Sequence, residues 1–271
     1  MTAPAGLELL VAAGRMAVMA KTSEAASASS AEPTGGRDVR VVLVTVCLGL
    51  LLFPFALTLL AVQSRWAPLL RVDNDARDSL NRYALAHPGF VAAMKAISDS
   101  GSVAAWVVVL ALVAAWLLWR RLPVLGLFVV ITALGSSVLN VVVKTAVHRL
   151  RPVVNDPVAM AHGLSFPSGH AQAAVVGYTV LMLVFLPALD GAWCKAAIAL
   201  AVLMVLAIGF SRIALGVHYV SDVVGGFVLG AAWVVAMMAA FNVMGVDRGR
   251  RGHLTPHRSA RYQCLRGNPG G

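Results

Sequence analysis

The amino-acid sequence predicts an all-α integral membrane protein whose body is a bundle of six membrane-spanning helices. Of its 271 residues, 59% are hydrophobic and only 13% are charged, about half the charged fraction of a typical soluble domain. Six windows contain no Asp, Glu, Lys or Arg. A large soluble protein with buried helices is the alternative, but six such windows leave too little sequence for a polar shell. The windows are 41–62, 103–119, 122–143, 171–189, 196–210 and 223–246.

The window 196–210 is the shortest of the six, whereas the other five are near or above the length that a hydrocarbon core of about 30 Å requires. Lys195 precedes this window and can extend its long side chain toward the membrane surface. Trp193 and Cys194 can continue the helix in the same direction. We therefore expect a membrane-spanning helix here as well.

Two polar tails flank the body of the chain. Residues 1–39 are rich in Ala and Ser with scattered charges, and no uninterrupted apolar stretch of a signal peptide is present. We predict a disordered cytoplasmic tail here, with Met16 or Met19 as an alternative start. Residues 247–271 are basic and lack apolar periodicity, which predicts a second cytoplasmic tail. The six-span domain then covers residues 40–246.

The distribution of Lys and Arg predicts the orientation of the bundle. Cytoplasmic flanks are enriched in these residues, and 13 of the 22 lie on the side of the termini, against nine on the other side. Both termini are therefore expected in the cytoplasm, and the Ala-, Val- and Arg-rich composition suggests a bacterial inner or plasma membrane. The net charge of +10 is assigned to tails that face anionic lipid, because no nucleic-acid-binding motif accompanies it.

Three polar segments interrupt the apolar sequence beside helix ends. They read KTAVHRLRP from Lys144, GLSFPSGHAQAA from Gly163 and SRIALGVHYVSD from Ser211. In the six-helix topology these segments lie at the ends of the third to sixth spans, and all of them face the extracytoplasmic side. Polar groups retained at one membrane surface predict a functional site there.

Lys144, Arg151 and Arg212 place three positive charges on this face. Like charges repel, so such a cluster is favoured when an anion lies among them. The guanidinium fork of Arg matches the oxygens of phosphate, and Lys adds a point charge. Interfacial snorkelling is the better explanation for any one of them alone, but three at neighbouring helix ends favour a phosphate site.

Ser168, Gly169 and His170 stand at the expected start of the fourth span. Unpaired backbone N–H groups at a helix N-terminus attract anions, and Gly169 lets the backbone approach closely. Ser168 can donate its hydroxyl to a phosphate oxygen, although a plain N-cap role explains this residue equally well. His170 is a candidate general acid.

His218 and Asp222 are four residues apart, so their side chains meet if the sixth helix begins by His218. A carboxylate bonded to one imidazole nitrogen leaves the other nitrogen free to act as a nucleophile. A metal site among the histidines of these segments is the alternative. No metal-binding spacing supports it, and the neighbouring cations would repel a divalent ion.

No metal, cofactor or disulfide is expected. The three cysteines, Cys47, Cys194 and Cys264, show no spacing typical of a metal site. In the predicted topology one lies within the membrane and two face a reducing cytoplasm, where disulfides are rare.

Together these residues resemble the motif of the type 2 phosphatidic acid phosphatase superfamily. This motif is Lys, six residues, Arg-Pro; then Pro-Ser-Gly-His; then Ser-Arg, five residues, His, three residues, Asp. The chain matches all eleven specified identities in order and at the required spacings. The superfamily includes lipid phosphate phosphatases, bacterial undecaprenyl-pyrophosphate phosphatases and the vanadium haloperoxidases. The resemblance covers the six-span body and does not extend to the tails.

The resemblance implies that His218 attacks phosphorus and becomes phosphohistidine, that Asp222 orients it, and that His170 protonates the leaving group. It also implies that the non-bridging oxygens are held without a metal ion by Lys144, Arg151, Arg212, Ser168 and the amide of Gly169. Supporting positions around this pocket are Arg149, Pro152, Pro167 and Ser211.

The implied activity is that of an integral membrane phosphatase acting on a lipid-linked phosphate monoester or pyrophosphate. Polyprenyl pyrophosphate is the first candidate substrate, followed by phosphatidic acid and phosphatidylglycerol phosphate. The segment 64–101, interpreted as an outer loop, is expected to help select the lipid. Two alternatives stay open. One is a vanadate-dependent haloperoxidase that uses the same pocket, and the other is a non-enzymatic anion-binding membrane protein, which needs no nucleophile.

Overall fold

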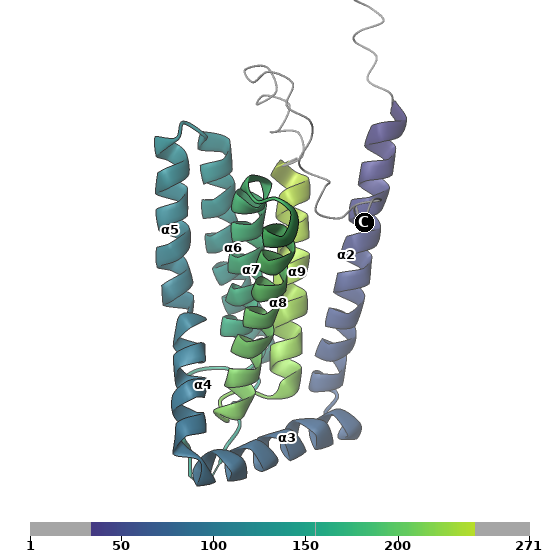
Figure 1. Cartoon of the computed structure of the whole chain (residues 1–271). Coiled ribbons are helices and arrows are strands. Elements are labelled where there is room, and N and C mark those ends of the chain that lie inside the picture. The colour runs from purple at the N-terminus through teal and green to yellow at the C-terminus, as the bar shows by residue number, and fades with distance from the viewer. Residues whose placement is uncertain (1–33, 155, 242–271) are drawn as a thin grey trace, which may run out of the picture. The chain divides into compact units, whose positions relative to one another are not determined.

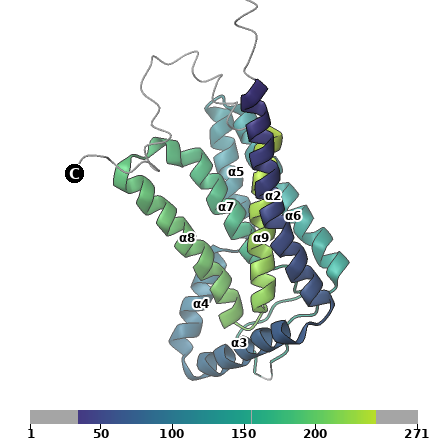
Figure 2. The same cartoon turned by 90° about the vertical axis from the view of Figure 1, so that its right-hand side faces the viewer.

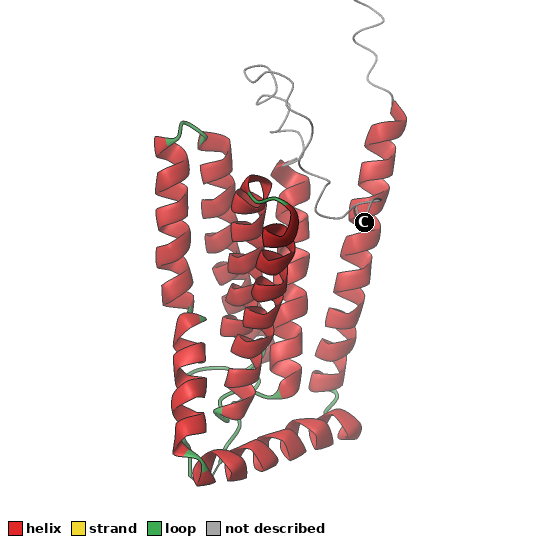
Figure 3. Cartoon of the chain, viewed as in Figure 1, coloured by secondary structure: helices red, strands yellow, loops and turns green. Residues whose placement is uncertain are grey.

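The computed structural model describes residues 34–154 and 156–241, and every element in this part of the chain is helical (Figure 3). The expected tail 247–271 and most of the tail 1–39 lie outside the described residues. The chain divides into two compact units, residues 1–46 and residues 47–271. The packing described below is that of the second unit.

The helices differ in length and in polarity. In chain order they are α2 (Thr34–Gln63), α3 (Ala67–Ala86), α4 (Pro88–Ser100), α5 (Val103–Trp119), α6 (Pro123–Val147), α7 (Gly169–Phe185), the 3-10 helix η1 (Leu186–Ala188), α8 (Gly191–Ala214) and α9 (Val220–Phe241).

Six stretches of the described chain are long and apolar enough to cross a membrane. They are Val41–Gln63, Pro88–Trp119, Pro123–Val147, Gly169–Ala188, Gly191–Ala214 and Val220–Phe241. The predicted all-α fold with six spans is therefore confirmed. The short window at 196–210 belongs to α8, which begins at Gly191, so the expected extension of this helix is confirmed too.

The segment 64–101 is not a loop, which corrects the interpretation from the sequence. It forms α3, which lies across the ends of the bundle helices in Figures 1 and 2, and α4, which continues into α5 as one long span. Charged residues along α3, together with Lys95 and Asp99 in α4, kept both helices out of the charge-free windows. Only Asp73 and Ala84 of α3 are buried, so most of its charges stay at the surface.

Helix α7 is central to the packing, because it contacts α5, α6, α8 and α9. A buried apolar cluster joins α5, α6, α7 and α9, and its largest members include Trp106, Leu117 and Phe128. Many other large apolar side chains on these helices are exposed, for example Leu112 at 67%. A surface of this kind is suited to contact with lipid, since the bilayer core solvates apolar groups.

A buried polar network joins α6 to α7. The amide nitrogen of Asn140 donates to the side-chain oxygen of Gln172 at 2.7 Å. The amide nitrogen of Gln172 in turn donates to both the backbone oxygen and the hydroxyl of Ser136. Because unpaired polar groups are costly in hydrocarbon, these bonds hold the two helices at one height and one rotation.

The expectation of no disulfide is wrong for Cys194, which is disulfide-bonded. Cys47 is an exposed free thiol, and Cys264 lies outside the described residues. The expectation rested on the compartment that each thiol would face. Disulfide formation also depends on the distance between two sulfur atoms, which the sequence does not contain.

Candidate active site

The three polar segments converge at one end of the bundle, where α6 ends, α7 begins, α8 ends and α9 begins. Helix α6 closes at Val147, and His148 adopts a left-handed conformation (φ 53°) as its C-cap, a common way to end a helix. Ser168 precedes α7, and its hydroxyl accepts a hydrogen bond from the N–H of Ala171. Its backbone N–H donates to the carbonyl of Asp222 at 2.9 Å, which ties the starts of α7 and α9 together.

A tight turn after α8 places His218. The turn passes through Gly216 at φ +69°, a conformation that glycine adopts without steric cost. The backbone N–H groups of Val217 and His218 then both donate to the carbonyl of Arg212. The imidazole is thereby held against the end of the same helix that carries Arg212.

His218 and Asp222 meet, but not along a helix face. Helix α9 begins at Val220, so His218 lies just before the helix and the condition under which the sequence analysis expected the contact is not met. The pair meets because the turn at Tyr219 folds back, with the N–H of Tyr219 donating to Asp222 Oδ2 at 2.9 Å. His218 Nδ1 lies 3.4 Å from the same oxygen, and both side chains are fully buried.

The other imidazole nitrogen of His218 faces Arg151. Arg151 Nη1 lies 3.0 Å from His218 Nε2. Since a guanidinium only donates hydrogen bonds, Nε2 is the acceptor and Nδ1 carries the proton toward Asp222. Burial lowers the pKa of His218 to about 4, which keeps the ring neutral at physiological pH. The arrangement leaves an unprotonated nitrogen directed at a cation.

Two further cations lie within electrostatic range of Arg151. Lys144, in the last turn of α6, donates from Nζ to the carbonyl of Leu164 at 2.7 Å. Arg212, in the last turn of α8, is only 8% exposed and donates from Nη1 to the hydroxyl of Ser98. Its Nε atom has no hydrogen-bond partner within the described part of the chain. A buried guanidinium N–H with no acceptor is suited to an anionic ligand.

Gly169 and His170 form the first turn of α7 and are both half-buried. A Cβ atom on Gly169 would lie 3.4 Å from the side-chain oxygen of Asn140, so the backbone here is close to the polar network of α6. His170 is within electrostatic range of four other residues of the site, namely Arg212, His218, Arg151 and Lys144. The structure therefore brings together every charged residue of the predicted site.

The supporting positions differ in what they contact. Arg149 bonds Asp222 directly, at 2.7 Å from its Nη1 to Oδ1. Pro152 follows Arg151 in the loop, and Pro167 follows a cis peptide bond after Phe166. The hydroxyl of Ser211 donates to the carbonyl of Ile208 within its own helix. Its proton is therefore engaged within α8 and is not directed at the pocket.

Four buried polar residues in contact with the site were missed by the sequence analysis. They are Asp73, Ser98, Ser165 and Ser221. Ser165 donates to Asp222 Oδ2, and Ser98 contacts Arg212. None of the four belongs to a specified position of the motif. Two signals were available: Ser165 and Ser221 lie within polar segments quoted above, and Asp73 is a carboxylate in a segment next to membrane spans.

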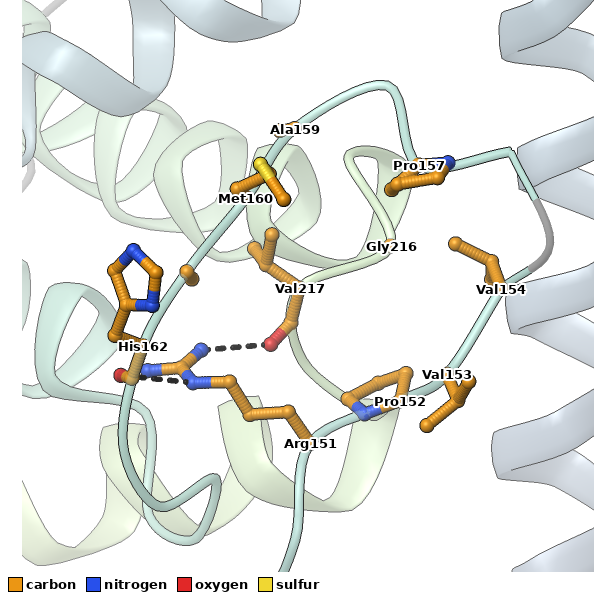
Figure 4. Close-up of a pocket in the computed structure, with 11 residues that line it drawn as sticks. Arg151, Pro152, Val153, Val154, Pro157, Ala159, Met160, His162, Gly216 and Val217 are labelled. Atoms are coloured by element: carbon orange, nitrogen blue, oxygen red, sulfur yellow. Dashed lines mark hydrogen bonds between the residues drawn. The ribbon is translucent and has the colours of Figure 1, made fainter.

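A cavity of about 240 Å³ opens beside Arg151 (Figure 4). It is lined by the chain after Arg151, including Pro152 and Val154, and by Gly216 and Val217. Arg151 lines the cavity and donates from Nη1 to the carbonyl of Val217 at 2.8 Å and from Nε to the carbonyls of His162 and Gly163. The cavity therefore leads to the same guanidinium that contacts His218.

Comparison with known proteins identifies the family. Residues 123–244 match the model of the PAP2 superfamily. Phosphatidylglycerophosphatase B of Bacillus subtilis is 32% identical over 157 residues, which are 57% of this chain and 73% of that protein. Undecaprenyl-diphosphatase of Sulfolobus acidocaldarius is 30% identical over 143 residues, 51% of this chain and 64% of that protein.

A solved structure shares the fold. The crystal structure of a transmembrane PAP2 type phosphatidylglycerolphosphate phosphatase from Bacillus subtilis superposes with a TM-score of 0.63 at 25% sequence identity. The match covers 78% of this chain and 99% of the other. The resemblance inferred from the motif is confirmed: this multi-pass membrane protein belongs to the PAP2 superfamily and, within it, to the membrane lipid phosphatases.

Proposed function

We propose that the protein hydrolyses a lipid-linked phosphate monoester or pyrophosphate through a phosphohistidine formed on His218. The main observation behind this proposal is that the two ring nitrogens of His218 face groups of opposite charge. Nδ1 faces the buried carboxylate of Asp222, and Nε2 faces Arg151. A neutral imidazole with its proton held on Nδ1 has its lone pair on Nε2, where a phosphoryl group held by Arg151 would arrive.

In the proposed first step, Nε2 forms a bond to phosphorus and the bond between phosphorus and the leaving oxygen breaks. His170 gives its proton to that oxygen, so the lipid leaves as an alcohol or as a lipid monophosphate. A water molecule then gives a proton to His170 and its oxygen bonds to phosphorus, while the bond between phosphorus and Nε2 of His218 breaks. Inorganic phosphate leaves, and both histidines return to their starting state. Through both steps the charge on the non-bridging oxygens is stabilised by Lys144, Arg151, Arg212, Ser168 and the amide of Gly169.

The chemistry is proposed to need no metal ion, because Lys144, Arg151 and Arg212 would supply positive charge around a bound phosphate. We also propose that the site faces the extracytoplasmic side of a bacterial plasma membrane, as the count of Lys and Arg predicts. In that position a phosphate head group enters from the membrane surface while its tail stays in hydrocarbon and keeps its apolar contacts.

The proposed substrate class is a lipid with a terminal phosphate or pyrophosphate. One relative is named for a glycerophospholipid phosphate and the other for a polyprenyl pyrophosphate, so both types belong in the first substrate panel. Polyprenyl pyrophosphate, phosphatidic acid and phosphatidylglycerol phosphate should each be compared with a water-soluble phosphate ester in detergent. Lipid specificity requires a higher kcat/KM for at least one lipid than for the soluble ester.

Replacement of His218 by Asn tests the mechanism. We expect His218→Asn to abolish both phosphate release and the trapped phosphoenzyme, because Asn has no nucleophilic nitrogen. Asp222→Asn should lower the rate by about 10²- to 10⁴-fold without eliminating it, since the imidazole stays but its tautomer is no longer fixed. The matched control is His148→Asn, at an exposed position whose left-handed conformation Asn tolerates.

The alternatives give different outcomes in the same assays. A His218→Asn protein with normal phosphate release would end the phosphohistidine proposal. A wild-type protein that binds phosphate but releases none from any lipid would favour anion binding. Halogenation that depends on vanadate and hydrogen peroxide, without hydrolysis of a lipid phosphate, would favour the haloperoxidase.

A further inference from the structure

Arg149 is held between two buried carboxylates that come from distant parts of the chain. Its Nη1 donates to Asp222 Oδ1 at 2.7 Å, and its Nη2 donates to Asp73 Oδ2 at 2.7 Å. Both carboxylates have no exposed side-chain surface, and Arg149 is 12% exposed. Asp73 lies in α3 and Asp222 in the first turn of α9, so this ion pair network fixes α3 against the active site.

Asp73 uses both of its oxygens. Oδ1 accepts from the backbone N–H of Ser221 at 3.0 Å, and Oδ2 accepts from the hydroxyl of Ser221 at 2.6 Å as well as from Arg149. Ser221 is the residue next to Asp222. A carboxylate that accepts three hydrogen bonds in a buried position has one conformation, and it transmits that order to the groups that donate to it.

The charges in this network do not cancel. One guanidinium is shared by two carboxylates, so the cluster of Arg149, Asp73 and Asp222 keeps one net negative charge. Arg149 binds only Oδ1 of Asp222, whereas Oδ2 is left for Ser165, the N–H of Tyr219 and the imidazole of His218. If Arg149 had Asp222 as its single counter-ion, it would draw more of the negative charge away from Oδ2.

We propose that Asp73 is a positioning residue for the reaction, which acts through Arg149 and Ser221 to orient Asp222 and to keep its charge directed at His218. The inference rests on the proposed function of His218 as nucleophile. Asp73 lies outside residues 123–244, the range that matches the family model. It is also the one charged residue of α3 that is buried, while Asp75, one half-turn away, is exposed.

The test compares Asp73→Asn with Asp75→Asn, which makes the same chemical change on the same helix. We expect Asp73→Asn to lower kcat by about 10- to 100-fold, by analogy with the loss seen when a residue that orients a metal ligand is replaced. KM and inhibition by vanadate should change by less than about threefold, because the phosphate-binding cations are untouched. The Asp75→Asn protein should keep the kcat and KM of wild type.

A merely structural role for Asp73 would reduce the yield or the melting temperature of the protein and leave kcat per folded molecule unchanged. That result would overturn the inference. A rise in KM of about 10- to 100-fold with an unchanged kcat would overturn it as well. Should Asp73→Asn fail to fold, Ser221→Ala removes two hydrogen bonds of this network without a change of charge, namely the one that the hydroxyl donates to Asp73 and the one that it accepts from Arg149. We then expect kcat to fall by about two- to tenfold, and a wild-type kcat would contradict the inference.

The His218→Asn protein separates this inference from the proposed function. If His218→Asn is inactive and Asp73→Asn is fully active, the mechanism stands and the role of Asp73 fails. If His218→Asn turns over normally, the phosphohistidine mechanism is wrong. The proposed role of Asp73 is then wrong too, because it assumes that His218 is the nucleophile.

Discussion

Arg151 and His218 are in direct contact, with 3.0 Å between Nη1 of the guanidinium and Nε2 of the imidazole. The same Nη1 atom donates to the carbonyl of Val217 at 2.8 Å, and Nε donates to two carbonyls of the loop that follows. Backbone acceptors on two sides therefore fix the guanidinium over the nitrogen that is proposed to attack phosphorus. A phosphoryl group that reaches Nε2 meets Arg151 at the same moment.

From this contact we predict that Arg151→Lys lowers kcat/KM by about 10²- to 10³-fold, although the charge is kept. The guanidinium has several donors in one plane, so it can bind the two loop carbonyls, the carbonyl of Val217 and a phosphate oxygen together. The single ammonium group of lysine cannot do this. Steady-state phosphate release measures the change, with Arg71→Lys on the exposed face of α3 as control. Wild-type kinetics for Arg151→Lys would show that only the charge matters.

The second prediction concerns pH. Burial lowers the pKa of His218 to about 4, and the hydrogen bond and charge of Asp222 offset part of this effect. Because the imidazole must be neutral to attack, its contribution to kcat/KM is present above that pKa and is lost as pH falls through it. We expect the acid limb of the profile near pH 4 instead of about 6.5, the value of an ordinary histidine.

The profile should be recorded with both a monoester and a pyrophosphate, so that titration of the substrate can be separated from that of the enzyme. An acid limb near pH 6.5 with both substrates would contradict the assignment of a buried, neutral His218.

The third prediction tests His170 as the general acid. We expect His170→Ala to slow hydrolysis of substrates with poor leaving groups, such as lipid alcohols, far more than that of nitrophenyl phosphate, whose leaving group needs no proton. The slope of log kcat/KM against leaving-group pKa should become steeper in the variant. An equal loss with every leaving group would instead assign His170 to binding.

The fourth prediction concerns metal ions and transition-state mimics. We expect EDTA to leave turnover unchanged, because Lys144, Arg151 and Arg212 supply the positive charge. Vanadate should inhibit, since it adopts the five-coordinate geometry of phosphorus during transfer. Inhibition should weaken in Arg212→Ala, which removes the buried guanidinium. Activity that is lost in EDTA and restored by a divalent ion would contradict this prediction.

The fifth prediction tests the orientation in the membrane. A membrane-impermeant maleimide should label Val153→Cys in intact cells and should not label Arg120→Cys, with the parent protein as background. Val153 is 82% exposed in the loop beside the active site, and Arg120 is exposed at the turn between α5 and α6. The reverse pattern would place the chemistry in the cytoplasm.

The sequence predicted the spans well and the connections poorly. Charge-free windows reveal helices that face lipid, because a charge at membrane depth is costly. They do not reveal α3, whose charged residues lie along a surface helix, or α4, where Lys95 and Asp99 interrupt the apolar run. Such helices are fixed by what they pack against, and α4 packs on α8.

The same distinction holds for the site. The motif predicted residues whose spacing is local, such as His218 and Asp222, and the structure brings them together. Asp73 was missed because its partners Arg149 and Ser221 are 76 and 148 residues away. Sequence periodicity does not predict contacts between residues so far apart in the chain. These contacts depend on the packing of α3 against the ends of the other helices.

The bonds that join Asn140, Gln172 and Ser136 bear on how the protein is assembled after insertion. Lipid tails are as apolar as the neighbouring helices, so apolar contact alone gives a newly inserted helix little reason to choose one orientation. Buried amide groups do favour one orientation, because leaving them unpaired costs free energy. The hydrogen bonds of Asn140 and Gln172 form only when α6 and α7 are rotated to face each other in this way. The network also bears on the site, because Lys144 and Ser168 are each one turn from one of its members. The pairing of two buried amides therefore helps to set the height of both residues at the end of the bundle.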